Sequence, residues 1–188
     1  MTVEPLRDRL VSAGVELLEE TGASELGLRA IAREAGVSHG APRRYFPTHT
    51  ALLAAIAARG FVDLGSTFAT HQNAEPRARV AGIALDYVGF AAERREMFTL
   101  MFRHDLLEGS GENLRQRTLP LYHQWATFVT ACAVDHPEDR ALALWTNLHG
   151  IAVLVANRSL ELVAPGRNWR HLVTEAVDQH LGTSPTAD

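Results

Sequence analysis

The sequence contains no lysine, so all 18 of its basic residues are arginine. Arginine codons are GC-rich and lysine codons are not, and the bias is therefore typical of a GC-rich genome. It has a chemical consequence as well. Any long cationic side chain of this protein that contacts a phosphate carries a planar guanidinium group, which can bind phosphate through two parallel hydrogen bonds.

Other absences limit where the protein acts. Cys132 is the single cysteine, which excludes an internal disulfide and indicates a reducing compartment. No aliphatic run approaches the roughly 20 residues that a membrane-spanning helix needs. The first twenty residues are rich in charge and lack the apolar stretch of a signal peptide. We therefore predict a cytoplasmic protein.

The sequence patterns of common enzymes are also missing. Nine histidines are present, but no HxxxH or HExxH pair places two of them on one helix face for a metal. There is no glycine-rich phosphate loop, no GxGxxG run and no GxSxG run. We predict no catalytic residue, no metal site and no cofactor.

What is present is an apolar, folded chain with one basic region. Hydrophobic residues make up 46% of the 188 residues and charged residues 21%, which excludes extensive disorder. The net charge is −4, yet residues 27–60 contain five arginines and a single acid, Glu34. The arginines are Arg29, Arg33, Arg43, Arg44 and Arg59. A local basic region on an acidic protein indicates a surface that faces phosphates.

Apolar residues recur at helical spacing along most of the chain, and no stretch alternates for long enough to form a strand. We expect the first three helices over residues 5–21, 28–35 and 38–45. Thr48 or Thr50 is expected to cap a fourth helix. Further helical blocks are expected near 76–103, 112–134, 137–160 and 168–181. The predicted fold class is all-α.

Residues 28–46 have the pattern of a helix-turn-helix. A short amphipathic helix is followed by a tight turn around Gly36, and Ser38 is a good N-cap for the next helix. Pro42 falls in or next to the first turn of that helix, where a missing N–H costs least. A helix-turn-helix places its second helix in the major groove of DNA.

The run ELLEETGASELGLRAIAREAGVSHGAPRRYFPTHTALLAAI resembles the N-terminal domain of TetR-type bacterial transcriptional repressors, and the resemblance covers about residues 5–60. In that family three helices form a DNA-binding head, and a fourth links it to a ligand-binding, dimerising body. Trp145, His149 and Gly150 are similar to the W-x-x-x-H-G signature of one C-terminal subfamily. The resemblance implies a repressor that binds a palindromic operator as a homodimer and is released by a small effector.

The residues expected to contact DNA lie in the second half of the motif and at the start of the next helix. They are Ser38, His39, Gly40, Arg43, Arg44, Tyr45, Thr48 and His49. Arginine is the residue that most often reads guanine, and it also contacts phosphate, so Arg43 and Arg44 are the strongest candidates. Ser38 and His39 are expected at the N-terminus of the recognition helix, where backbone N–H groups favour phosphate. His49 is expected to donate a hydrogen bond to phosphate, either as a neutral or as a protonated ring.

The rest of the chain is rich in helix-spaced aromatic and methionine side chains. Most of them are expected to pack in the core, and a subset is expected to line a pocket for a hydrophobic effector of drug-like size. The predicted lining residues are Phe90, Met97, Met101, His104, Tyr122 and Trp125.

The last two long helices are apolar around much of their circumference and need burial on two sides. A two-fold interface between two copies of the chain provides that burial. The residues predicted to form it are Leu148, Ala152, Val155, Val173 and Val177. The alternative is that these helices complete the core of one compact monomer.

These patterns predict three parts of the chain. A helix-turn-helix head occupies residues 1–60, an effector-binding and dimerisation body occupies 61–182, and a disordered tail occupies 183–188. The predicted function is transcriptional regulation, with an operator, a small effector and a second copy of the chain as partners. The alternative is a helical small-molecule-binding or enzymatic bundle whose helix-turn-helix no longer binds DNA.

Overall fold

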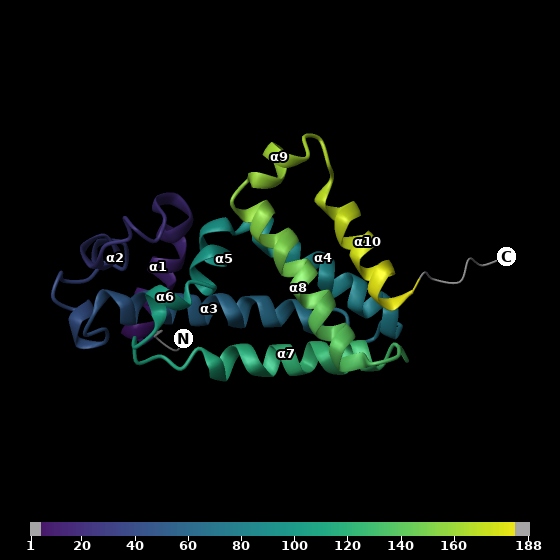
Figure 1. Cartoon of the computed structure of the whole chain (residues 1–188). Coiled ribbons are helices and arrows are strands. Elements are labelled where there is room, and N and C mark those ends of the chain that lie inside the picture. Colours follow the sequence, from purple (N-terminus) through teal and green to yellow (C-terminus); the bar gives the residue numbers. More distant parts are fainter. Residues whose placement is uncertain (1–4, 183–188) are drawn as a thin grey trace. The chain divides into compact units, whose positions relative to one another are not determined.

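The computed structural model describes residues 5–182 (Figure 1). Every regular element in that range is a helix, and no strand occurs among the described residues. The all-α fold class predicted from the sequence is therefore confirmed. The tail predicted at 183–188 lies outside the described residues.

Ten α-helices and one 3₁₀-helix, η1, are formed by the described residues. In chain order they are α1 (Leu6–Thr21), α2 (Leu28–Glu34), η1 (Pro42–Arg44), α3 (His49–Ala69), α4 (Pro76–Glu93), α5 (Arg95–Met101), α6 (His104–Leu107), α7 (Arg115–Thr130), α8 (Pro137–Ala156), α9 (Ser159–Val163) and α10 (Trp169–Leu181).

The chain divides into two compact units. Unit 1 comprises Met1–Val62 and Arg94–Arg117, and unit 2 comprises Asp63–Glu93 and Thr118–Asp188. Residues 94–117, which contain α5 and α6, therefore group with the N-terminal helices. Helices α3 and α7 each contribute residues to both units.

Unit 1 contains the first half of α3, in which residues 51–57 are all buried. By length and composition α3 is apolar enough to cross a membrane, but 61% of that window is buried inside the structure, which is typical of a core helix. Helix α1 approaches α3 closely at Gly14, where an added Cβ would lie 2.5 Å from Cδ1 of Ile56. Glycine at this position thus permits the contact between the two helices.

Helix α5 is attached to unit 1 in two ways. At Gly60 of α3, an added Cβ would lie 2.6 Å from the sulfur of Met97 and 2.6 Å from that of Met101, so the backbone of α3 packs directly on the two thioethers. At the start of α5, the Glu19 carboxylate accepts hydrogen bonds from the backbone N–H groups of Glu96, at 3.2 Å, and Met97, at 3.0 Å. A carboxylate at a helix N-terminus satisfies donors that have no partner within the helix.

Unit 2 is built on α4, α8 and α10, each of which packs against the other two. Helix α7 is attached to α8 through Trp125, whose indole N–H donates to the carbonyl of Ala141 at 3.0 Å. The second half of α3 packs closely on α7 at Gly65, where an added Cβ would lie 2.8 Å from Cδ2 of Leu121.

Two helical blocks expected from the sequence are interrupted. The block at 76–103 is two helices, because Arg94 has a φ of −120° and a ψ of 65° and separates α4 from α5. The block at 137–160 ends as α8 at Ala156, since Arg158 adopts a φ of +63° that no α-helix continues.

Candidate nucleic-acid interface

The turn after α2 is a Schellman motif. The N–H of Val37 donates to the carbonyl of Ala32 at 2.9 Å, and the N–H of Gly36 donates to that of Arg33 at 3.1 Å. Gly36 has a φ of +66°, which glycine adopts without strain. The sequence therefore predicted the end of this helix and the cause of its turn correctly.

The second helix of the motif differs from the expectation. Residues 38–45 do not form an α-helix; only Pro42–Arg44 are helical, as the 3₁₀-helix η1. In an α-helix capped by Ser38, the first intrahelical hydrogen bond runs from the N–H of residue 42 to the Ser38 carbonyl. Residue 42 is proline, which has no N–H. That carbonyl instead accepts from Ala41 at 2.9 Å, and Tyr45 donates to Pro42 at 3.0 Å, which gives a series of tight turns.

Without an α-helix at residues 38–45, Ser38 and His39 lose the role expected of them. Ser38 does not cap an α-helix, and neither Ser38 nor His39 lies at an α-helical N-terminus with its aligned N–H groups. Both side chains are nevertheless exposed. Any contact they make with DNA must therefore come from the side chains themselves or from single backbone groups.

All eight residues predicted to contact DNA are exposed in unit 1. Tyr45 is 43% exposed, whereas Phe46 beside it is 2% exposed and belongs to the core. Pro42 is also buried, so Pro42 and Phe46 anchor the segment between them. Arg43 and Arg44 lie between these two anchors and are exposed. A segment held at both ends in this way presents two guanidinium groups to solvent.

Thr48 and His49 make local contacts at the start of α3. The Thr48 hydroxyl oxygen accepts from the N–H of Ala51 at 3.0 Å, which identifies Thr48 as the N-cap. Nε2 of His49 lies 2.5 Å from the carbonyl oxygen of Leu26, and because a carbonyl only accepts, Nε2 carries the proton. A neutral His49 has no second N–H, so the expected neutral hydrogen bond to phosphate is not available; a protonated ring has one.

The basic region predicted from the sequence is exposed on unit 1. The side chains of all five arginines between residues 27 and 60 are exposed, as is that of Glu34. No charged side chain is buried among the residues that the structure describes. The excess positive charge of this region is therefore at the surface, where a phosphate backbone can reach it.

The six residues predicted to line an effector pocket are divided between the two units. Met97, Met101 and His104 belong to unit 1, where the two methionines pack on Gly60 and His104 is exposed at the start of α6. Phe90, Tyr122 and Trp125 belong to unit 2. Trp125 is buried, and its indole N–H donates to the carbonyl of Ala141. This indole therefore serves the packing of α7 on α8.

An aromatic cluster in unit 2 was only partly predicted. The rings of Trp145 and His149 stack with centroids 5.3 Å apart, and Tyr122 meets Trp145 edge-on at 6.1 Å. Nδ1 of His149 lies 2.7 Å from the hydroxyl oxygen of Tyr87. Tyr87 was not among the predicted site residues, although its helical spacing with Val80, Ile83 and Ala84 places it on the buried face of α4.

The protonation of this cluster follows from its surroundings. Burial raises the pKa of the Tyr87 phenol far above its ordinary value, and a hydrogen bond from Trp145 opposes that shift only in part. The hydroxyl is therefore protonated and donates to His149. Burial lowers the pKa of His149, which favours the neutral ring that accepts this bond.

The five residues predicted for a dimer interface lie inside one chain. All of them are buried in unit 2, because their stripe on α8 faces α4 and α10, and that on α10 faces α4 and α8. They therefore have little surface to offer a partner. The large exposed apolar residues of α8 are Leu142, at 50%, and Val153, at 39%, on a different face of the helix.

Two family models match the chain. The model of the N-terminal region of bacterial regulatory proteins of the TetR family matches residues 10–56, which contain the whole helix-turn-helix region. The model of the tetracyclin repressor-like C-terminal domain matches residues 80–179, more than half of the chain. The chain belongs to the TetR family. The sequence has no match among curated proteins.

Solved structures share the TetR fold over almost the full length. A protein of unknown function from Rhodococcus sp. RHA1 is 31% identical with a TM-score of 0.80, and the match covers 95% of each chain. SCO7222, a TetR regulator from Streptomyces coelicolor, is 20% identical with a TM-score of 0.72 over 93% of this chain and 95% of that one. FadR from Bacillus subtilis, solved with stearoyl-CoA, is 14% identical with a TM-score of 0.65 over 94% and 99% of the two chains.

Proposed function

We propose that this TetR-family chain is a transcriptional repressor that binds a palindromic operator as a homodimer and leaves it when a small hydrophobic effector binds. The observation that carries the DNA-binding part is the exposed pair Arg43 and Arg44, held between the buried residues Pro42 and Phe46. Guanidinium groups at this position of a helix-turn-helix suit guanine in the major groove or the phosphates beside it.

A homodimer is proposed because two heads must reach successive major grooves, about 34–36 Å apart along DNA. Leu142, Thr146, Gly150 and Val153 recur every three or four residues on α8, and all four are exposed. On α9, Leu162 is 82% exposed and Val163 is 72% exposed. We place the dimer interface on these exposed surfaces of α8 and α9 rather than on the buried stripe predicted from the sequence.

The effector is proposed to be hydrophobic or mildly polar. No charged side chain is buried among the residues described, so phosphates carried deep into unit 2 would lack partners. The aromatic cluster of Tyr87, Tyr122, Trp145 and His149 offers apolar surface with neutral hydrogen-bonding groups. FadR of Bacillus subtilis was solved with stearoyl-CoA, which joins a long acyl chain to a phosphate-bearing CoA group, so only the acyl chain of that molecule supports an apolar ligand for a body of this fold.

Release from DNA is proposed to follow from a shift of α3, which contributes residues to both units. An effector moves the equilibrium only if it binds the DNA-free conformation more tightly than the DNA-bound one. By linkage, DNA must then weaken effector binding by the same factor.

The DNA-binding part is tested by selecting bound fragments from random and genomic DNA with the purified full-length protein. We expect an enriched palindrome, because a symmetric dimer selects a symmetric site. The matched control is the double variant Arg43→Ala, Arg44→Ala, which should enrich nothing above background while retaining its helical circular dichroism. Equal enrichment by the control, or a selected site without a repeat, would contradict the proposal.

The effector part is tested separately, by a thermal-shift screen of hydrophobic compounds followed by DNA-binding measurements on the compounds that stabilise the protein. We expect at least one stabilising compound to release the operator. If compounds bind tightly and the DNA complex is unaffected by all of them, the coupling between effector and operator is refuted and DNA binding stands alone.

A further inference from the structure

A groove of about 320 Å³ lies within unit 2, between the C-terminal part of α3, the C-terminal half of α4 and the first turn of α10. Its polar lining residues are Ser66, Thr67, Thr70, Asp86, Glu93 and Arg170. We propose that it binds a basic amino acid, or a small molecule with the same two ammonium groups and one carboxylate. This site is additional to the hydrophobic effector site and does not depend on it.

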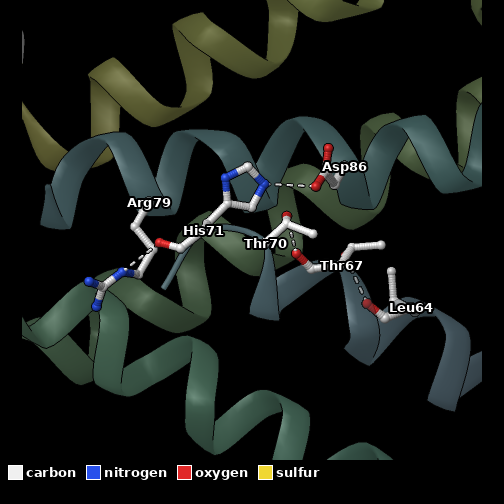
Figure 2. A network of polar contacts seen from close by, with 6 residues as sticks. All are labelled: Leu64, Thr67, Thr70, His71, Arg79 and Asp86. Carbon is white, nitrogen blue, oxygen red and sulfur yellow. Dashed lines mark hydrogen bonds and ion pairs between the residues drawn. The ribbon is translucent and has the colours of Figure 1, made fainter. Parts of the chain in front are cut away.

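The hydroxyl groups in the groove can only accept hydrogen bonds from a ligand. Ser66 donates its hydroxyl proton to the carbonyl of Asp63 at 2.6 Å. Thr67 donates to Leu64 at 2.8 Å, and Thr70 donates to Thr67 at 2.7 Å, as Figure 2 shows. A hydroxyl has one proton and two lone pairs, so each of these groups has lone-pair capacity left and no proton to give. This wall of the groove therefore selects a ligand rich in N–H donors.

Two carboxylates lie along the groove wall formed by α4. Asp86 and Glu93 are seven residues apart, which places their Cα atoms about 10.5 Å apart along the helix axis. Nε2 of His71 lies 2.8 Å from Oδ2 of Asp86 (Figure 2) and holds that carboxylate in place. This bond occupies Oδ2 of Asp86 and leaves its Oδ1 as an acceptor for a ligand N–H.

Glu93 and Arg170 line the same groove without neutralising each other. In the part of the chain that the structure describes, Glu93 makes no ion pair, and no carboxylate lies within 4.0 Å of the Arg170 guanidinium. Arg170 instead lies over the ring of Trp169, 4.4 Å from its centroid. The Trp169 ring in turn lies 3.7 Å from the position of a Cβ on Gly89, which fixes the start of α10 beside the groove.

The charges in the groove define the ligand. Two carboxylates and one guanidinium are complemented by two ammonium groups and one carboxylate, so that each charge gains an opposite partner. Leu85 and Phe90 add apolar lining, which suits the methylene chain between the two ammonium groups. L-lysine has this combination of groups and is small enough for the volume.

Calorimetric titration of the full-length protein with three related probes tests the assignment. L-lysine is compared with norleucine, which lacks the side-chain ammonium, and with 1,5-diaminopentane, which lacks the carboxylate. We expect lysine to bind and each of the other two to bind at least about tenfold more weakly, because each loses an ion pair. Absence of lysine binding at millimolar concentration, or equal affinity for all three, would overturn the proposal.

Variants test which residues act. Arg170→Gln is expected to weaken lysine binding about tenfold and to leave 1,5-diaminopentane unaffected, since only lysine has a carboxylate to lose. Glu93→Gln should weaken both lysine and 1,5-diaminopentane. The matched control is Glu175→Gln, because Glu175 is exposed on α10 and pairs with His171 outside the groove. Unchanged lysine affinity in both groove variants refutes the site, and neither readout requires DNA.

Discussion

Arg7 of α1 and Glu112, in the connection between α6 and α7, are 105 residues apart in the sequence, and Nη2 of Arg7 lies 2.6 Å from Oε1 of Glu112. The same guanidinium lies over the ring of Phe46, with its carbon 5.4 Å from the ring centroid. Phe46 closes the segment that carries Arg43 and Arg44. Within unit 1, one arginine thus links the candidate DNA-contacting segment to residues 94–117.

Arg7→Ala removes both contacts, together with an exposed ion pair to Asp8 at 3.9 Å, and is expected to lower the free energy of unfolding by about 1–2 kcal/mol. Glu112→Gln removes the ion pair and leaves the cation over the ring, so we expect a loss below about 1 kcal/mol. Urea denaturation of both variants measures the difference. If Glu112→Gln costs as much as Arg7→Ala, the contact with Phe46 contributes nothing.

Arg43→Ala and Arg44→Ala are each expected to weaken operator binding without lowering stability, because both side chains are exposed. An arginine that reads guanine should cost about 1–3 kcal/mol and relax the preference at one base pair. An arginine that contacts phosphate should weaken binding to all sequences alike and reduce the salt slope by about one unit. Fluorescence anisotropy at several salt concentrations separates the two roles.

Arg117→Ala is the control for these measurements, since Arg117 is exposed in unit 1 but lies outside the helix-turn-helix. Its operator affinity should equal that of the wild type. Wild-type affinity in both helix-turn-helix variants would contradict the assignment of this surface to DNA.

The parts of the fold that depend on local pattern were predictable. Periodic apolar residues defined the helices, and Gly36 defined the turn after α2, because the energetics of a helix end are set within a few residues. The position of Pro42 is visible in the sequence, but its full effect is not local to one residue: in a helix capped by Ser38 it removes the first backbone hydrogen bond. The 3₁₀ turns that replace this helix follow from one missing N–H.

The candidate sites depend on contacts that no local pattern contains. Glu19 caps α5 across 77 residues of sequence, and Tyr87 meets His149 across 62. The sequence predicted correctly that α8 and α10 have apolar surfaces, but periodicity cannot assign each stripe to the interior or to a partner. Leu148 was assigned to the partner, and the structure places it in the core of unit 2.

Charge substitutions on α8 should therefore have two different outcomes. Leu148→Glu buries an unpaired charge in the core of unit 2 and is expected to destabilise the fold by about 3–5 kcal/mol. Leu142→Glu and Val153→Glu change exposed positions and should shift sedimentation from dimer to monomer while the helical signal persists. Thr127→Glu, exposed on α7, is the control and should leave the dimer intact. A folded monomeric Leu148→Glu variant would restore the interface predicted from the sequence.

Gly60→Ala is expected to destabilise the protein by about 1–3 kcal/mol, because the new methyl group meets the sulfur atoms of Met97 and Met101 in a packed core. Gly89→Ala is the matched substitution on another helix, where the nearest atom of Trp169 is at an ordinary contact distance of 3.7 Å. It should be neutral or stabilise by about 0.5–1 kcal/mol, since alanine favours the helix. If thermal unfolding gives the two variants the same melting temperature, α3 and α5 accommodate the added methyl group without a loss of stability.

The contact between Tyr87 and His149 makes stability depend on pH. Burial lowers the folded-state pKa of His149, so as the pH falls through the ordinary histidine value of about 6.5 the unfolded chain takes up the proton first, and stability decreases. Protonation also puts an N–H of His149 against the hydroxyl that donates to it. We expect wild-type stability to fall between about pH 7.5 and 5.5, and to fall less in His149→Gln. His180 is the internal comparison, because burial and Arg140 lower its pKa in the same direction. Urea denaturation of His149→Gln and His180→Gln at both pH values gives the share of each histidine in the loss of stability. If His149→Gln has the same pH dependence as the wild type, the His149 ring takes up its proton equally in the folded and unfolded states, and the expectation is wrong.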